Sequence, residues 1–292
     1  MAGVSPDRAL LALCERFSLW LRQGGGLAVR GRPLPGRALP GLDFEGFAEY
    51  TPGREVRHID WTLYARTRRL YVREYADEGA GLLAVLLDAS GSMAIGAPAK
   101  LTLARGLAAV LVFAGLRELH QVAVGVQSGG RTLWLPPTAG LDFAPAALRF
   151  LGRFEAAGAT DLAAACASLP VAGARGDAVL ISDFLDPRGA EAGLKALTRL
   201  GFRVDLCRVT AADEFEPPPA GAAVRDPEGE GWRPAPTGAA REELAARIAA
   251  HHAALVEAAR RHEALLIELD AATPLPQALE VFFRRVAATR GR

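Results

Sequence analysis

The sequence predicts an α/β protein with a mostly parallel sheet covered by helices on both faces, together with an N-terminal helix and a β-rich arm. Short apolar runs of strand length recur along the chain, as in LLAVLLD (82–88) and AVLISD (178–183). Amphipathic stretches of helical length separate these runs. Strands that are joined through helices form right-handed crossovers and pair in parallel. Half of the 292 residues are hydrophobic, which suffices for a large core.

Residues 1–78 are expected to form an N-terminal helix and an arm that packs on the main domain. The helix begins after Ser5, a suitable N-cap, with Pro6 in its first turn. Its apolar face carries Leu10, Leu13, Cys14, Phe17 and Leu21. A stretch rich in Gly, Pro and Arg follows, and residues 43–75 end in the strand-like LYVREY.

The main domain is expected at 79–292, where strands and helices alternate. The strands are expected at 82–88, 120–127, 131–136, 178–183, 203–209 and 264–269. The helices are expected at 98–116, 143–153, 161–169, 188–200, 239–263 and 274–289. The strand at 131–136 is expected to pair with its predecessor through the turn at Gly129 and Gly130. The proline-rich stretch 211–237 is expected to leave the sheet as a loop or hairpin.

Composition and charge narrow the class of protein. The net charge of +1 gives no global attraction to nucleic acid or anionic lipid. The three cysteines are odd in number and far apart, so they predict reduced thiols and neither a disulfide framework nor a zinc site. No apolar run approaches the ~20 residues of a membrane span. The N-terminal apolar stretch is interrupted by Glu15 and Arg16, unlike a signal peptide. We therefore expect a cytoplasmic protein.

Oxygen-bearing side chains gather where two of the buried strands end. Asp88, Ser90 and Ser92 follow the strand at 82–88, and Asp183 ends the strand at 178–183. Thr160 lies in the loop GATDL that opens another helix. Ligands of open parallel sheets bind beyond the carboxyl ends of the strands, so these five side chains can converge. Hydroxyls and carboxylates suit Mg²⁺, with Mn²⁺ or Ca²⁺ as alternatives. Each segment taken alone also has a purely structural interpretation as a helix cap.

These residues resemble the metal-ion-dependent adhesion site of von Willebrand factor A-like domains. The family pattern is Asp-x-Ser-x-Ser after the first strand, a Thr in a later loop and an Asp after the fourth strand. All five positions are filled here, by Asp88, Ser90, Ser92, Thr160 and Asp183. The resemblance implies a von Willebrand factor A-like (Rossmann-like) fold. It also implies that the hydroxyls bind the metal, that the carboxylates act directly or through water, and that a partner supplies a Glu or Asp.

A second resemblance concerns residues 43–78, which are similar to the hallmark region of the bacterial domain-of-unknown-function family 58. The matching positions are Tyr50, Pro52, Gly53, Arg57, Ile59, Asp60, Trp61, Ala65, Arg66, Val72, Arg73 and Glu74. Ala48 and Arg54 depart from the family pattern, which has Arg and an acidic residue there. Pro52 and Gly53 suit a type II turn. Trp61 is a candidate core anchor for the arm.

The second resemblance also implies partners. Members of that family are typically encoded beside MoxR-type AAA+ ATPases and are thought to act with them in the chaperone-like maturation of client proteins. The expected function is therefore a non-enzymatic, Mg²⁺-dependent interaction module that docks the ATPase or a client offering an acidic side chain. The chain has no GxxxxGK[ST] motif, so ATP hydrolysis would belong to the partner.

Two other functions remain open. Segment 54–73 has six Arg against Glu55 and Asp60. This excess could bind nucleic acid, with Tyr64 and Tyr71 stacking on bases. A structural network of Arg57, Asp60, Arg66, Arg73 and Glu74 is the alternative that we favour.

A Mg²⁺-dependent phosphohydrolase would use Asp88 as the nucleophile, with Asp183 and Asp186 as further acids. Such enzymes, typified by the haloacid dehalogenase superfamily, need a second Asp two residues after the first as the acid/base. Ser90 stands at that position, and a hydroxyl does not perform this proton transfer near neutral pH. The phosphohydrolase is therefore the weaker alternative.

Overall fold

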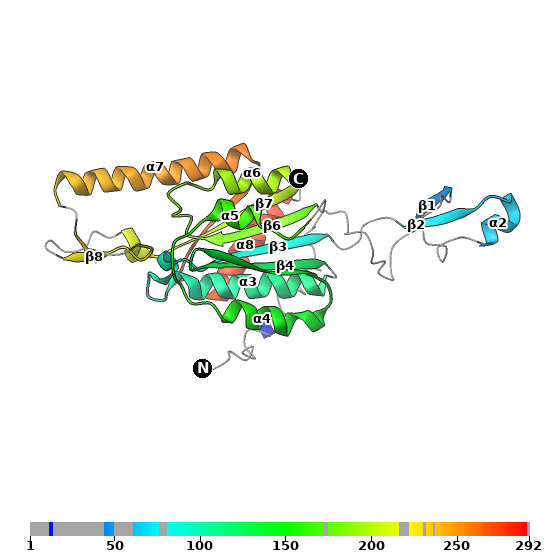
Figure 1. Cartoon of the computed structure of the whole chain (residues 1–292), viewed down its shortest axis with the longest axis horizontal. Coiled ribbons are helices and arrows are strands. Elements are labelled where there is room, and N and C mark those ends of the chain that lie inside the picture. Colours follow the sequence, from blue (N-terminus) through cyan, green and yellow to red (C-terminus); the bar gives the residue numbers. More distant parts are fainter. Residues whose placement is uncertain are drawn as a thin grey trace.

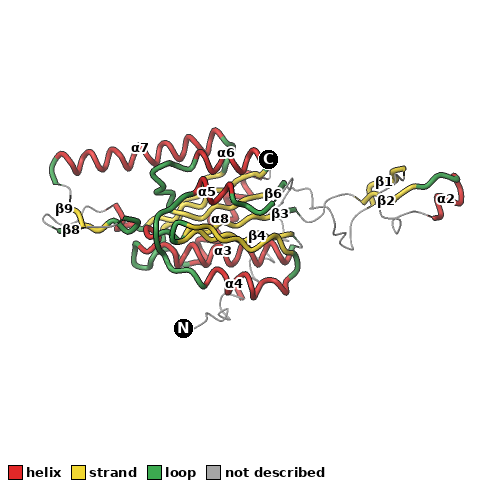
Figure 2. The backbone as a smooth tube through the Cα atoms, viewed as in Figure 1, coloured by secondary structure: helices red, strands yellow, loops and turns green. Residues whose placement is uncertain are grey.

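The computed structural model describes residues 12–13, 44–49, 61–75, 81–118, 120–171, 175–215, 222–229, 232–235 and 237–290. The described chain is built around one six-stranded sheet, with two small two-stranded sheets outside it. Figure 1 shows helices on both sides of the central sheet, and Figure 2 shows how the loops connect them.

The strands of the central sheet follow the order β10-β7-β6-β3-β4-β5. Their bounds are β3 (Leu82–Asp88), β4 (Gln121–Ser128), β5 (Arg131–Thr138), β6 (Gly176–Ser182), β7 (Phe202–Thr210) and β10 (Leu265–Asp270). All neighbours pair in parallel except β4 and β5, which form the antiparallel pair expected from the Gly129–Gly130 turn. The sheet is therefore mostly parallel, as the sequence predicts.

Helices cover both faces of this sheet and bury two separate cores. Helices α3 (Lys100–Arg117), α4 (Ala144–Gly152) and α8 (Leu275–Arg290) pack on one face, against side chains such as Val85 and Leu87. Helices α5 (Leu162–Ala167), α6 (Glu191–Arg199) and α7 (Ala239–Arg261) pack on the other, against Leu82, Ala84 and Leu86. Successive residues of β3 thus serve opposite cores, which is why the whole strand is apolar.

Outside the central sheet lie two pairs of antiparallel strands and several short 3-10 turns. The 3-10 turns are η2 (Gly91–Ala94), η3 (Leu141–Phe143) and η4 (Ala212–Phe215). Strands β8 (Ala223–Arg225) and β9 (Trp232–Pro234) pair antiparallel, so the excursion expected at 211–237 contains a hairpin. Strands β1 (Phe44–Glu49) and β2 (Tyr71–Tyr75) pair around α2 (Trp61–Thr67).

The N-terminal unit is described only in part. Figure 1 draws β1, α2 and β2 apart from the central sheet, so the expected packing of the arm on the main domain stays a prediction. Of the expected N-terminal helix, only residues 12–13 are described, and Leu13 packs against the core that α3, α4 and α8 share. The remainder of that helix lies outside the described residues.

Two further expectations can be compared with the described residues. Cys166 and Cys207 are free and buried, and burial raises the pKa of each thiol to about 12. Both therefore stay protonated at neutral pH and act as core residues. Among the described helices, none combines the length and the apolar character that a membrane crossing requires.

Candidate functional site

The candidate site lies at the carboxyl end of the central pair of strands. Asp88 ends β3, Asp183 directly follows β6, and β3 and β6 are hydrogen-bonded neighbours. The chain leaves β3 toward β4 on one side, whereas β6 lies on the other side, so this is where the strand order reverses. Such a reversal point is the usual ligand site of an open α/β sheet.

Asp88 is a buried carboxylate whose hydrogen-bond donors are all neutral. Its Oδ1 accepts from the backbone N of Ser90 at 2.8 Å. Its Oδ2 accepts from Ser182 Oγ at 2.6 Å and from Thr160 Oγ1 at 3.2 Å. Burial raises the pKa of Asp88 to about 6, and the nearby carboxylate of Asp183 adds to the rise. Among the described residues, no cationic side chain contacts Asp88.

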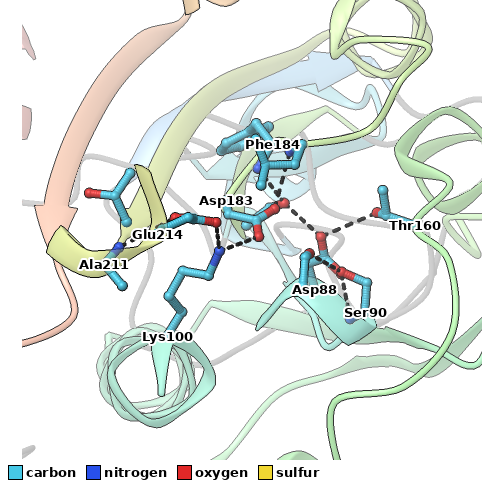
Figure 3. Close-up of polar contacts among 12 residues, drawn as sticks. Asp88, Ser90, Lys100, Thr160, Asp183, Phe184, Ala211 and Glu214 are labelled. Carbon is cyan, nitrogen blue, oxygen red and sulfur yellow. Dashed lines mark hydrogen bonds and ion pairs between the residues drawn. The ribbon is translucent and has the colours of Figure 1, made fainter. Parts of the chain in front are cut away.

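The two serines of the motif turn back beside Asp88. Ser90 and Ser92 are buried, and their hydroxyl oxygens lie 3.1 Å apart. Gly91 N donates to the carbonyl of Gly158 at 2.8 Å, which ties the motif to the loop that carries Thr160. The hydroxyls of Thr160 and Ser182 thus donate to the Asp88 carboxylate, and Ser90, which lies beside it in Figure 3, contacts Ser92.

Thr160 is held in place from both sides of its loop. Arg188 Nη2 donates to the Thr160 carbonyl at 2.9 Å. Asp186, which is fully buried, accepts from Leu162 N at the start of α5, and the side chain of Asp161 accepts from Ala164 N. These contacts fix the loop between Gly158 and α5, so the threonine hydroxyl stays on Asp88.

Asp183 has a different electrostatic environment, because a buried lysine contacts it (Figure 3). Lys100, at the start of α3, is 0% exposed. Its Nζ donates to Asp183 Oδ2 at 2.7 Å and also to Glu214 Oε1. Asp183 Oδ1 accepts from Leu185 N at 3.1 Å. Burial raises the pKa of Glu214, and Lys100 counteracts the rise. Asp183 is therefore already neutralised by an internal ammonium, unlike Asp88.

Phe184 adds local backbone strain next to Asp183. It adopts φ 56°, a left-handed conformation that a bulky residue rarely takes, and it is buried. Its backbone N donates to Ser182 Oγ at 2.8 Å, and its carbonyl accepts from His251 Nε2 at 2.6 Å. These contacts compensate for the strained conformation, which turns the chain sharply after β6.

The structure brings together all five residues that the sequence singled out, and it adds partners that sequence reasoning missed. The missed residues that contact them are Lys100, Gln127, Ser182, Arg188 and Glu228, and Glu214 contacts Lys100 in turn. Lys100 had a signal in the sequence, because it is one of only two lysines among 34 basic residues. The others carry no distinctive spacing.

The residues present fit a hard cation. Within the described part of the chain, no group of three or more His, Cys, Asp or Glu side chains could hold a metal ion. The site instead offers the hydroxyls of Thr160 and Ser182 on Asp88 and the paired hydroxyls of Ser90 and Ser92 next to it, which are oxygen donors that Mg²⁺ accepts. Two buried carboxylates, Asp183 and Glu214, contact the ammonium of Lys100, whereas a third, Asp88, lies close enough to Asp183 for its pKa to be raised by it. A divalent cation would offset this excess of negative charge.

The hallmark residues of the arm are described less completely. Tyr50, Pro52, Gly53, Arg57 and Asp60 lie outside the described residues. Arg66 belongs to α2, and Arg73 and Glu74 belong to β2, so their expected ion network stays a prediction.

Trp61 is 62% exposed and makes a T-shaped contact with Tyr64 at 6.1 Å between ring centroids. The structure thus does not bury Trp61 in a core, and its role in anchoring the arm stays a prediction. An exposed aromatic side chain still suits recognition.

The chain is similar to several proteins of unknown function. A family model described as "Protein of unknown function DUF58" matches residues 47–254. Uncharacterized proteins of Mycobacterium bovis and Mycobacterium tuberculosis are 29% identical over 193 residues, which is 64% of this chain and 61% of each relative. The chain thus spans about three fifths of the length of the curated relatives it matches.

Among solved structures, the conserved hypothetical protein BatB from Bacteroides thetaiotaomicron is 18% identical with a TM-score of 0.46. The match covers 73% of this chain and all of BatB. The PilB minor pilin from Streptococcus sanguinis is 10% identical with a TM-score of 0.44, and the match covers 75% of this chain and 64% of the pilin.

Proposed function

The chain belongs to the DUF58 family of proteins of unknown function, and we propose that it is a non-enzymatic, Mg²⁺-dependent protein-interaction module. The observation that carries the proposal is Asp88, a buried carboxylate that is surrounded by hydroxyls and contacts no cationic side chain among the described residues. A mostly parallel sheet with its site at the reversal of the strand order supports the proposed von Willebrand factor A-like character.

Asp88, Ser90, Ser92 and Thr160 would hold the cation, with Asp183 behind them. A cation bound largely by neutral hydroxyls supplies residual positive charge that attracts an acidic side chain from another molecule. The ion pair with Lys100 restricts the side-chain rotation of Asp183. Arg188 and Asp186 fix the loop that carries Thr160. The partner is proposed to be a MoxR-type AAA+ ATPase or one of its clients.

Two contacts favour recognition over phosphate hydrolysis. Ser90, rather than a second aspartate, stands two residues after Asp88, and its hydroxyl lies against Ser92. Both oxygens of Asp186 are already hydrogen-bonded, one to Leu162 N and the other to Arg188. Hydrolysis of a generic aryl phosphate that is lost in Asp88→Asn would favour the phosphohydrolase instead.

Calorimetric titration with Mg²⁺ or Mn²⁺ tests the proposal. The wild-type chain is expected to show one weak site, which Asp88→Ala abolishes and Thr160→Ala weakens. Asp177→Asn is the matched control, because Asp177 is also buried but lies at the amino end of β6 and pairs with Arg203. Equal metal binding by wild type and Asp88→Ala would contradict the proposed site. Co-purification with a MoxR-type AAA+ ATPase, with and without chelator, tests the partner.

A further inference from the structure

A surface segment of the chain lies directly over the candidate site. Residues 226–229, with the sequence Asp-Pro-Glu-Gly, connect β8 toward β9, and we call them the acidic strap. The strap touches both segments that carry the hydroxyls around Asp88. One contact comes from the side chain of Glu228, and the other comes from the backbone of Pro227.

Glu228 reaches the site through Thr160. The backbone N of Thr160 donates to Glu228 Oε2 at 3.1 Å, while the hydroxyl of the same threonine reaches Asp88. The second oxygen, Glu228 Oε1, is shielded from solvent and has no hydrogen-bond partner among the described residues. A buried carboxylate oxygen without a partner is costly, so this oxygen is available for a ligand that the protein alone does not provide.

Pro227 brings the strap against the serine motif. A Cβ added to Gly91 would lie 2.0 Å from the carbonyl oxygen of Pro227, which no side chain tolerates. Gly91 stands between Ser90 and Ser92 and does not adopt a left-handed φ, so the close approach of the strap is what requires glycine here.

The strap is built to present Glu228. Asp226 Oδ1 accepts from Glu228 N at 3.0 Å, which forms a tight turn with Glu228 on its inner side. By contrast, residues 223–227 are all exposed. The described contacts of the strap with the site are thus one hydrogen bond and one backbone approach, which a competing segment can replace.

The charges around Glu228 indicate which kind of ligand it would contact. It adds a fourth carboxylate to Asp88, Asp183 and Glu214, where Lys100 is the one ammonium that contacts this group among the described residues. Like charges repel in a buried setting, so this arrangement becomes favourable when a cation joins the group.

We propose that the acidic strap is an internal ligand, which occupies in cis the place of the partner's acidic segment. The inference rests on the proposed function and extends it. The partner recognised by this chain would present a Glu or Asp on a short turn, as Asp226–Gly229 does. Binding of that partner would require the strap to leave, so the strap sets a threshold for binding.

A peptide of residues 222–235 is the probe, added in trans to the full chain with saturating Mg²⁺. Glu228→Gln removes the internal carboxylate, and Glu243→Gln, on the exposed surface of α7, is the matched control. An internal segment competes at an effective concentration of roughly millimolar, so Glu228→Gln is expected to bind the peptide at least about tenfold more tightly than wild type. Chelator, or a peptide with Gln in place of Glu228, is expected to abolish binding. Gly91→Ala, which leaves Glu228 intact but expels Pro227, is expected to act like Glu228→Gln.

The outcomes separate the two proposals. If wild type binds Mn²⁺ through Asp88 but Glu228→Gln and wild type bind the peptide equally, or both fail to bind it, the strap is not an internal ligand and the proposed function stands. If the full chain binds no Mn²⁺, the proposed function and the proposed role of the strap are both wrong. Tighter peptide binding by the Glu243→Gln control would also overturn the strap, because it would show a general charge effect.

Discussion

Asp88 and Lys100 lie at the same end of the sheet, but only the charge of Lys100 is compensated by side chains of opposite charge. Lys100 is fully buried and compensated by two carboxylates, Asp183 and Glu214. The hydrogen-bond donors of Asp88 are all neutral. The low polarisability of the interior makes an uncompensated charge expensive, and the raised pKa of Asp88 expresses that cost. The positions of the two residues therefore imply different consequences of mutation.

Asp88→Asn is expected to stabilise the cation-free protein above pH 6 while it removes cation binding. Because the pKa is raised in the fold from 3.8 to about 6, the stability contributed by protonated Asp88 is complete below pH 3.8 and is lost as the pH rises through about 6. The gain in free energy of unfolding at pH 8 should be on the order of 1–3 kcal/mol. Urea unfolding with chelator between pH 5 and 8 measures it. The same pH dependence in wild type and variant would contradict the assignment.

Lys100→Met is expected to lower the free energy of unfolding by about 3–5 kcal/mol, because Asp183 and Glu214 would be left buried without their ammonium. Lys195→Met, at the exposed second lysine of the chain, is the matched control and should be neutral. The affinity for Mg²⁺ should rise in Lys100→Met, since the site becomes more negative. Chemical unfolding and calorimetry check both effects. A neutral Lys100→Met would show that the ion pairs do not matter for stability.

At the scale of elements, the connection between β6 and α6 shows how a loop serves a distant site. Asp186 O accepts from Gly189 N in a tight turn, and Gly189 has φ 73°. This turn delays α6 to Glu191, although the sequence predicts a helix from 188. The turn instead directs Arg188 at Asp161 and at the Thr160 carbonyl. The residues where the predicted and the observed start of α6 differ are thus residues that position the candidate site.

Arg188→Met is expected to weaken Mg²⁺ binding about tenfold, since residues that orient metal ligands typically carry effects of this order. Its side chain is 56% exposed, so solvent screens its ion pairs and they should add little to stability. Calorimetry and thermal unfolding separate the two effects. Arg199→Met, at the exposed end of α6, is the matched control. A loss of stability without a loss of cation affinity would show that Arg188 only supports the fold.

For the molecule as a whole, the candidate site joins segments that lie far apart in the sequence. Asp88, Thr160 and Asp183 come from three connections that meet where β3 and β6 pair. The two cores on opposite faces of the sheet fix these connections independently of the site. A cation bound here would therefore act on the folded state and not on the unfolded chain.

Mg²⁺ is expected to stabilise the whole fold through this linkage. At a concentration of 100 times the Kd, the free energy of unfolding should rise by about 2.7 kcal/mol. Urea unfolding at increasing Mg²⁺ measures the rise, which chelator should reverse. Asp88→Ala should show no rise. An equal rise in that variant would place the bound cation elsewhere.

The sequence by itself predicted the order of strands and helices in the main domain and pointed to the five oxygen-bearing residues of the candidate site, because these depend on local patterns. Apolar runs of strand length give β3 and β6, and the residues that follow a strand must lie at its carboxyl end. Only the tertiary structure decided which charges meet there. Lys100 lies 83 residues from Asp183 and 114 from Glu214, and Glu228 lies 68 residues from Thr160. Such pairings depend on how the layers pack, since burial strengthens an electrostatic contact only after distant segments have been brought together.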